Sequence, residues 1–340
     1  MECIFKHALT REVAYNTLLH ETRKVIHERT AQAIESARSH ELDDHGGNLA
    51  HHYTRSGKVE KAIEYSQLAG VQASQRAAST DAVNYFRTAL TLLRTLSPSA
   101  ARDRREFTLL IAMGAQLVNG NGVTNPETGE AFLPARELCE KVRTPVQICA
   151  ALIGPHVYFT TRGESEKGCV FAQELLQRAR AIEKPDLSGY GYVAPSGCNF
   201  YCGRIIEARK HAEAGLELYS TERDLHQARF YGYDTRVTGL NCDSLSRWSL
   251  GFPEQSSQKV EQSLVYARTL SYPFMHGVAL LWAAICHCLR RDYPRCSDGV
   301  AMLLPLAQEH AMQEMIAWAT ILRGWARSQL GERGASAEIA

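Results

Sequence analysis

The feature of this sequence that most constrains its fold is a series of short turns that recurs about every 40 residues. Turn residues stand at Gly163, Gly203, Gly251, Asp292 and Gly331, with spacings of 40, 48, 41 and 39 residues. Each turn follows an apolar segment with helical periodicity and precedes another one. A period of this length holds two helices and is typical of stacked helix hairpins, the repeating unit of an α-solenoid.

The apolar pattern is helical along almost the whole chain. Runs of alternating apolar and polar residues long enough to suggest a strand are very few. We therefore predict an all-α fold, a right-handed α-solenoid of helix hairpins similar to tetratricopeptide repeats. The alternative is an irregular helical bundle in which the glycines are incidental.

Small residues recur where neighbouring helices of such repeats must approach closely. A small side chain admits the next helix, an aromatic ring fills the wedge between helices, and a glycine ends the helix in a left-handed turn. Gly57 follows Ala50 by seven residues, and Gly331 follows Gly324 by the same interval. The residues that we predict to form the repeat-packing contacts are Ala50, Tyr53, Gly57, Ala62, Ala69, Gly70, Ala82, Phe86, Ala89, Gly324 and Gly331.

Composition narrows the classes of function. Lys and Arg number 38 against 37 Asp and Glu, so the formal net charge is +1, without the basic excess of a nucleic-acid binder. Apolar stretches such as residues 277–286 are far shorter than the roughly 20 residues that cross a bilayer, and the start carries no signal-peptide pattern. The ten cysteines are irregularly spaced within helical patterns, which favours reduced core thiols. We expect a cytoplasmic protein that binds neither nucleic acid nor membrane.

Two segments near the N-terminus resemble parts of a known family. Residues 4–19, "IFKHALTREVAYNTLL", resemble the segment that closes the ATPase module of bacterial class III adenylate/guanylate cyclase regulators and related predicted signal-transduction ATPases. Residues 49–70, "LAHHYTRSGKVEKAIEYSQLAG", resemble the first repeat of the tetratricopeptide-like region that follows this module in the family. The resemblance covers about residues 4–334 and implies a C-terminal repeat array joined to a nucleotide-binding module.

The chain also departs from this family. It contains no G-x-x-x-x-G-K-[ST] motif, and its nearest approach, residues 163–168, continues into Cys169 and Val170 instead of Lys and a hydroxyl residue. The pair of metal-binding aspartates of a cyclase domain is not recognisable either. The resemblance therefore implies neither ATPase nor cyclase activity for this chain, and we predict that it is not an enzyme.

The resemblance implies three parts. Residues 1–44 are a helical segment closing a missing ATPase module, residues 45–97 are the first repeats, and residues 98–340 are further helix hairpins cut in mid-repeat. Both ends then look truncated, as in a fragment or a split gene product, and we expect their apolar faces to promote self-association. Within the array, residues 187–203 are rich in glycine and contain Pro195, so we expect a kinked or poorly formed repeat there.

The histidines do not suggest a metal site. His40 and His45 are five residues apart and precede two glycines, whereas a zincin places its two histidines at i and i+4 on one helix. His51 and His52 point about 100° apart on a helix, which favours a structural or surface role.

Cysteines and nucleophile motifs are equally uninformative. Cys198 and Cys202 can share a helix face, and Cys286, Cys288 and Cys296 are close in sequence, but four converging zinc ligands are not visible. No G-x-S-x-G motif occurs. We expect no catalytic residue, no cofactor and no bound metal.

Aromatic residues at helical spacing are the remaining candidates for ligand binding. Trp318 and Trp325 are seven residues apart and share one helical face, a spacing that is equally common in cores. The candidate binding face consists of Trp282, Trp318, Trp325, Tyr190 and Tyr201.

Together these observations suggest a non-catalytic repeat scaffold or sensor arm of a signalling ATPase or cyclase regulator. It would bind a protein, peptide or small effector on its concave face, and its partner would be an ATPase or cyclase module in the same or a neighbouring chain. The alternative is a free-standing tetratricopeptide adaptor or the effector arm of a transcription regulator.

Overall fold

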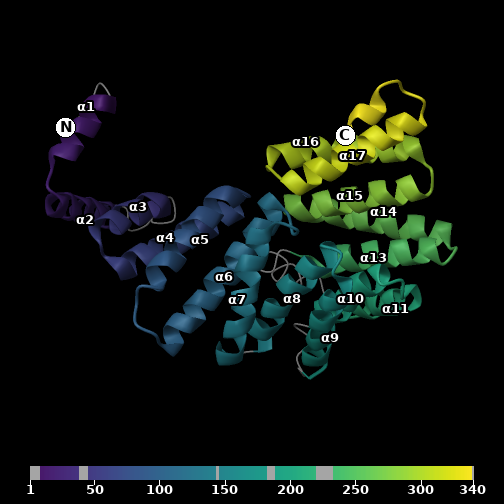
Figure 1. The fold of residues 1–340 in the computed structure, drawn as a ribbon, viewed down its shortest axis with the longest axis horizontal. Helices are drawn as coiled ribbons and strands as arrows, with labels where there is room; N and C mark the ends of the chain where they lie inside the picture. Colours follow the sequence, from purple (N-terminus) through teal and green to yellow (C-terminus); the bar gives the residue numbers. More distant parts are fainter. Residues whose placement is uncertain (1–7, 38–44, 143–144, 182–187, 220–232, 339–340) are drawn as a thin grey trace. The chain divides into compact units, whose positions relative to one another are not determined.

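The computed structural model describes residues 8–37, 45–142, 145–181, 188–219 and 233–338. These residues form α-helices joined by short turns, one 3-10 helix and no strand (Figure 1). The predicted all-α solenoid of helix hairpins is therefore confirmed. The chain divides into two compact units, Met1–Arg102 (unit 1) and Asp103–Ala340 (unit 2).

Unit 1 is built from consecutive helices, each packed against the next from α2 to α5. They are α1 (Ala8–Thr17), α2 (His20–Ala37), α3 (Gly46–Ser56), α4 (Val59–Gln75) and α5 (Ser79–Leu93).

The core of unit 1 combines small residues with aromatic rings. Gly70 of α4 lies so close to Phe86 of α5 that a Cβ atom at position 70 would be 2.5 Å from a ring carbon. Tyr53 and Tyr65 are buried and stack with their ring centroids 5.4 Å apart. Both hydroxyls donate hydrogen bonds to the carboxylate of Glu35 on α2. These contacts join α2 to the α3–α4 hairpin.

Unit 2 consists of two layers of helices. The helices α8, α10, α13, α15 and α17 each contact the next in this series, and we call them the A layer. The helices α9, α11, α14 and α16 each pack between two A-layer helices, and we call them the B layer. The elements of unit 2 are α6 (Ala100–Asn121, which begins just before the unit boundary), α7 (Pro126–Val142), α8 (Pro145–Thr161), α9 (Ser165–Ala181), α10 (Ser188–Tyr201), α11 (Ile205–Glu217), α13 (Thr235–Ser249), α14 (Pro253–Thr269), α15 (Pro273–Leu289), α16 (Tyr293–Glu309) and α17 (Gln313–Gln329).

Most of the turns adopt the left-handed conformation that ends a helix. Gly163, Gly203, Gly251 and Gly331 have φ angles of 82, 77, 85 and 82°, and no atom lies within 4 Å of a Cβ built on any of them. Backbone conformation, and not lack of space, therefore explains glycine at these positions. The turn that the sequence placed at Asp292 lies one residue earlier, at Arg291, with a φ angle of 61°. The Asp292 carboxylate instead caps α16 by accepting a hydrogen bond from the backbone N–H of Arg295.

The glycine-rich segment at residues 187–203 differs from expectation. Its residues 188–201 form the helix α10 and are not a poorly formed segment. Gly191 allows α9 to approach, since a Cβ atom at position 191 would be 2.5 Å from the Cβ of Ala179. Close packing against α9 and α11 stabilises a helix that its composition alone would disfavour.

The ends of the described chain expose apolar side chains, although the C-terminal end is partly covered. Val13, Leu19, Val25 and Ile26 are exposed on α1, α2 and the turn between them. A 3-10 helix, η3 (Ala335–Glu338), follows the last turn and packs against α17. Among the described helices, none is both long and apolar enough to cross a membrane.

Candidate functional site

Helix α13 carries polar side chains through the core of unit 2. Residues 239–246 of this helix are all buried because α10, α11, α14 and α15 surround it. Asn241, Asp243, Ser244 and Ser246 are among them. Such a helix needs polar partners inside the protein, since unpaired polar groups are destabilising when buried.

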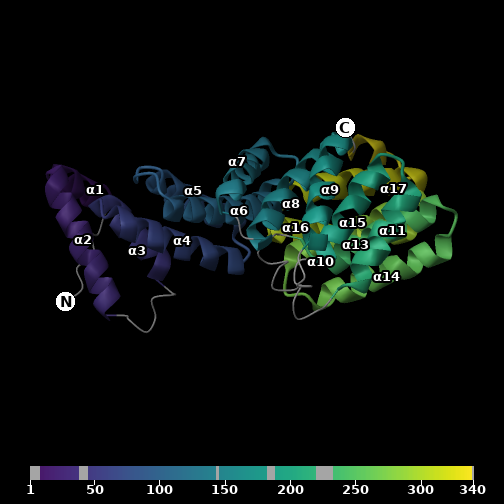
Figure 2. The same cartoon turned by 90° about the horizontal axis from the view of Figure 1, so that it is seen from below.

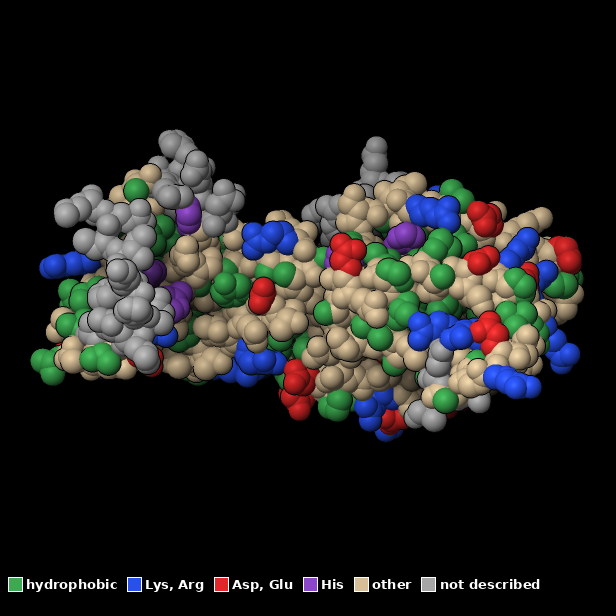
Figure 3. Space-filling model, turned by 90° about the horizontal axis from the view of Figure 1, so that it is seen from above, with side chains coloured by type: hydrophobic (Ala, Val, Ile, Leu, Met, Phe, Trp, Pro, Cys, Tyr) green, Lys and Arg blue, Asp and Glu red, His purple; other side chains and the backbone are tan. Residues whose placement is uncertain are grey.

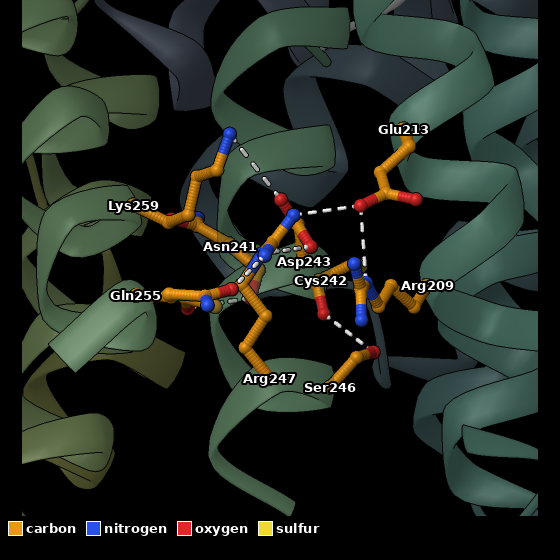
Figure 4. Close-up of polar contacts among 10 residues, drawn as sticks. Arg209, Glu213, Asn241, Cys242, Asp243, Ser246, Arg247, Gln255 and Lys259 are labelled. Carbon is orange, nitrogen blue, oxygen red and sulfur yellow. Dashed lines mark hydrogen bonds and ion pairs between the residues drawn. The ribbon is translucent and has the colours of Figure 1, made fainter. Parts of the chain in front are cut away.

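Charged residues on and around α13 supply the partners of Asp243 (Figure 4). Asp243 is 0% exposed, and its Oδ1 accepts a 2.8 Å hydrogen bond from Arg247 Nε while Lys259 Nζ lies 3.4 Å from its Oδ2. Arg247 also donates a 2.6 Å hydrogen bond to Glu213 Oε1, which accepts a second one from Arg209. We call these five residues the charged network. It joins α11, α13 and α14 and holds its carboxylates against cations, so its role is structural.

A row of aromatic rings runs across the interior of unit 2. Tyr190 of α10 lies 6.4 Å from Tyr233, Tyr233 lies 6.0 Å from Phe274, and Phe274 lies 6.1 Å from Tyr272, measured between ring centroids. The Tyr272 hydroxyl donates a 3.1 Å hydrogen bond to Asn119 Oδ1 on α6. Burial raises the pKa of Tyr190, Tyr233 and Tyr272, so these phenols stay protonated.

A second contact joins the turn after α6 to α17. These two helices, labelled in Figures 1 and 2, are the first and last α-helices described in unit 2. Glu314, in the first turn of α17, accepts a 2.7 Å hydrogen bond from the backbone N–H of Val123, in the turn between α6 and α7. Gly122 makes this approach possible, because its φ angle is +91° and a Cβ atom there would be 2.1 Å from Glu314 Oε2. Burial raises the pKa of Glu314, and the hydrogen bonds from the backbone oppose this shift. A segment near the beginning of unit 2 is thus hydrogen-bonded to its last α-helix.

The structure divides the predicted binding face into two groups. Tyr190 and Tyr201 lie near opposite ends of α10, with Tyr190 buried in the aromatic row and Tyr201 exposed. The three tryptophans lie on α15 and α17, which are neighbours in the A layer.

The tryptophans differ in exposure. Trp282 is half-buried on α15, and Trp325 packs edge to face against Tyr293 with ring centroids 5.1 Å apart. Trp318 is 45% exposed and Ile321, one turn further along α17, is 42% exposed. The A layer therefore presents large apolar side chains to solvent at α17.

Unit 1 contains a cluster of imidazoles. His27 of α2 and His52 of α3 form a hydrogen bond of 2.8 Å between their Nδ1 atoms, and the rings of His51 and His52 lie 5.3 Å apart. Tyr15 adds a 3.0 Å hydrogen bond to His27 Nε2. Burial, together with the positive charge of Arg55, lowers the pKa of all three histidines. Figure 3 shows histidine side chains on the surface of this unit. His40, weighed above as a zincin ligand, lies outside the described residues.

One group among the described residues has the spacing of a metal site. Ligand atoms of Glu166, Cys169 and Cys202 lie within 4.8 Å of one another. However, Arg204 stands among them and donates hydrogen bonds to Glu166 Oε1 at 3.0 Å and to Cys169 Sγ at 3.1 Å. Its positive charge opposes the binding of a cation.

Sequence reasoning missed the charged network, the histidine cluster, the Glu314 contact and the approach of Cys169 and Arg204 to Cys202. Tyr272 and Asn119 are 153 residues apart, and Glu314 and Val123 are 191 residues apart. No local pattern connects residues at such separations. The sequence signal for the charged network was the group of polar residues at positions 241, 243, 244 and 246 within one predicted helix.

Comparison with known proteins supports the fold. No protein-family model matches the chain. The uncharacterized protein R02095 of Rhizobium meliloti (strain 1021) is 25% identical over 328 residues, which are 95% of this chain and 32% of that protein. The chain thus spans about one third of the length of this relative.

Two solved structures are similar to most of the chain. A Rap protein complexed with Competence and Sporulation Factor has a TM-score of 0.62 at 11% identity, covering 94% of this chain and 85% of the Rap chain. NprR in complex with its cognate peptide NprX has a TM-score of 0.61 at 13% identity, covering 97% and 89%. This chain is therefore a tetratricopeptide-like helical repeat protein in fold.

Proposed function

We propose that this chain is a non-catalytic repeat scaffold that binds a peptide or an extended protein segment on the A layer of unit 2. The observation that carries the proposal is the exposure of Trp318 and Ile321 on α17, next to α15 with its half-buried Trp282. Large rigid aromatic side chains at solvent-facing positions are typical of binding surfaces. Solenoids bind extended ligands along such continuous layers. NprR, which resembles this chain in fold, was solved with a peptide.

The polar groups of unit 2 support binding over catalysis. Asp243 is fully buried between cations, and Glu314 accepts hydrogen bonds from the backbone, so neither carboxylate is free to act on a substrate. The sequence contains no phosphate-binding loop. On the face drawn in Figure 3, acidic and basic side chains are interspersed.

The test is to pan a displayed random peptide library on the immobilised full chain. Peptides that are retained should lose at least about tenfold in affinity when Trp318 is replaced by alanine, because a buried aromatic anchor contributes more than about 1.4 kcal/mol. Val170→Ala is the matched control, since Val170 is an exposed apolar residue of the B layer. Enrichment of no peptide, or equal binding by the Trp318→Ala variant, would contradict the proposal.

We further propose that the array works as the sensor arm of a signalling ATPase or cyclase regulator. The resemblance of residues 4–19 to an ATPase-closing segment supports this, as does the relative that is three times as long. The purified chain should form a stoichiometric complex with the nucleotide-binding module encoded next to it, detected by light scattering after gel filtration. Binding of peptides without any such complex would favour the adaptor.

A further inference from the structure

Three thiols meet where α9 packs against the end of α10. Cys169 lies on α9, Cys198 lies in the last turn of α10, and Cys202 lies in the turn that leads to α11. The Sγ atoms of Cys169 and Cys202 are within 4.8 Å of each other. A disulfide needs a separation of about 2.05 Å, so the two sulfur atoms need to approach by no more than about 3 Å.

Arg204 provides a reason for Cys169 to be reactive. Its guanidinium is held by Asn199 Oδ1 at 2.6 Å and by Glu166 Oε1 at 3.0 Å, and it donates a hydrogen bond of 3.1 Å to Cys169 Sγ. The guanidinium thus fixes the position of Cys169 Sγ beside a positive charge, and reactive cysteines are typically found in such electropositive, partly open surroundings. Glu166 is itself neutralised by Arg204 and is exposed to solvent, so its negative charge is largely screened.

Cys169 is largely buried, with 7% of its surface exposed, and it lines a hollow that is open to small molecules. A surface hollow of about 480 Å³ is lined by one face of α9, formed by Glu166, Cys169, Val170, Gln173, Glu174 and Gln177. Cys202 is partly exposed in the adjacent turn, whereas Cys198 is fully buried. Of the two neighbouring thiols, Cys202 is therefore the one with freedom to move toward Cys169.

A metal ion fits this site less well than oxidation does. Zinc takes four ligands and binds cysteine as thiolate, whereas the described residues bring three ligand atoms together here. Burial raises the pKa of Cys202 to about 11, so this ligand would release its proton to a metal less readily than an exposed cysteine. Arg204 would also have to leave its place between Glu166 and Cys169.

We propose that Cys169 and Cys202 form a peroxide-sensitive thiol pair, independent of the peptide-binding surface. The Cys169 thiolate attacks one oxygen of hydrogen peroxide, an S–O bond forms, the O–O bond breaks, and hydroxide leaves as water after taking a proton. Cys202 then loses its proton and attacks the sulfenic sulfur, the S–S bond forms, and the second oxygen leaves as water. In sum, two thiols and one peroxide give one disulfide and two waters. The disulfide ties α9 to the α10–α11 turn.

The experiment is peptide mapping of the full chain by mass spectrometry under non-reducing conditions after a brief treatment with hydrogen peroxide. We expect a crosslink between the peptides that carry Cys169 and Cys202, formed roughly tenfold faster than any modification of Cys286, which is 1% exposed against 7% for Cys169. Because Cys286 is an internal reference, this comparison needs no variant. Equal rates at Cys169 and Cys286 would overturn the proposal.

Two variants test the assignment of roles. Cys202→Ser should abolish the crosslink and leave a sulfenic acid on Cys169 that dimedone traps, and Cys169→Ser should abolish both products. Far-UV circular dichroism checks that each variant is folded, and Cys288→Ser is the matched control that should crosslink as the unmodified chain does. A crosslink to Cys198 in the Cys202→Ser variant, or one equivalent of zinc in the untreated chain that is lost in both variants, would overturn the proposal.

Discussion

The α4–α5 interface of unit 1 and the α13–α14 interface of unit 2 join neighbouring helices by opposite chemistry. Between α4 and α5, Gly70 accommodates the ring of Phe86, and the contact is apolar. Between α13 and α14, the fully buried Asp243 is paired with Lys259, and Arg247 holds its other oxygen. The same fold thus tolerates both a close apolar contact and a buried charge.

The difference lies in what each interface requires of its neighbours. The apolar contact depends on shape alone, so a small side chain on one helix and a ring on the other suffice. The charged contact depends on every partner being present, because removing one leaves an uncompensated charge in the core. The α13–α14 interface should therefore be the less tolerant of substitution, although it need not be the more stable.

Replacement of Asp243 by alanine should have the largest effect. Arg247 and Lys259 would keep their positive charges without their buried partner, and we expect a loss of about 3–5 kcal/mol in the free energy of unfolding. Urea unfolding measures it. The matched control is Lys61→Ala in unit 1, which removes an exposed partner of Glu35 and should lose less than about 1 kcal/mol. Equal losses for both variants would mean that the buried charges of the α13–α14 interface are no more sensitive to a missing partner than an exposed ion pair.

Replacement of Gly70 by alanine tests the apolar interface. Alanine favours a helix by about 1 kcal/mol over glycine, but its Cβ would overlap the ring of Phe86, so we expect a net loss of about 1–3 kcal/mol. A double-mutant cycle with Phe86→Leu should give a coupling energy of at least about 0.5 kcal/mol. Additive effects would show that the ring is not the obstacle.

Two glycines of α10 form a matched pair that extends this test to unit 2. Gly191→Ala should lose about 1–3 kcal/mol, because the new Cβ would meet the Cβ of Ala179 on α9. Gly197→Ala should gain up to about 1 kcal/mol, because no atom lies within 4 Å of the added group. Thermal unfolding of both variants checks the opposite signs. A gain for both would mean that α9 and α10 are not closely packed.

These glycines also show how far the sequence could be read. The hairpins and most turns follow from local periodicity and from glycines that stand at regular intervals. The local sequence predicts a poorly formed helix at α10 because its glycines disfavour a helix. The packing partners on α9 and α11 that stabilise it are not visible in the local pattern. The Glu314–Val123 contact spans 191 residues and could not be foreseen. The polar residues around Asp243 were a signal for buried polar contacts, but they did not identify Lys259 as its partner.

The histidine cluster should make unit 1 sensitive to acid. Folding lowers the pKa of His27, His51 and His52, so the native state resists their protonation. Above the ordinary histidine pKa of about 6.5, these residues do not reduce the free energy of unfolding. As the pH falls below this value, the free energy of unfolding decreases. Tyr15, Arg23 and Arg55 are the other titratable or charged groups at the cluster.

The measurement compares His52→Gln with the unmodified chain in urea at pH 7.5 and 5.5. The variant should show a smaller fall in the unfolding midpoint by far-UV circular dichroism, because one imidazole that resists protonation is gone. All four tryptophans lie in unit 2, so tryptophan fluorescence should show no difference between the two proteins. His20→Gln, at the exposed start of α2, is the matched control. If His52→Gln shows the same pH dependence as the unmodified chain, the histidine cluster is not the cause of the acid sensitivity of unit 1.

The smallest expected effect concerns two turns that carry alanine where most others carry glycine. Ala77 in unit 1 and Ala311 in unit 2 have φ angles of 57 and 52°, a left-handed conformation that destabilises alanine by about 1–2 kcal/mol. Glycine removes this strain but loses about 0.5–1 kcal/mol through its more flexible unfolded state. Ala77→Gly and Ala311→Gly should therefore each gain about 0.5–1 kcal/mol in thermal unfolding, and the reverse change Gly163→Ala should lose a similar amount. This effect depends on backbone conformation alone, so the gain should be equal in the two units. A gain in only one of them would mean that the units differ in their turns as well as in their helix interfaces.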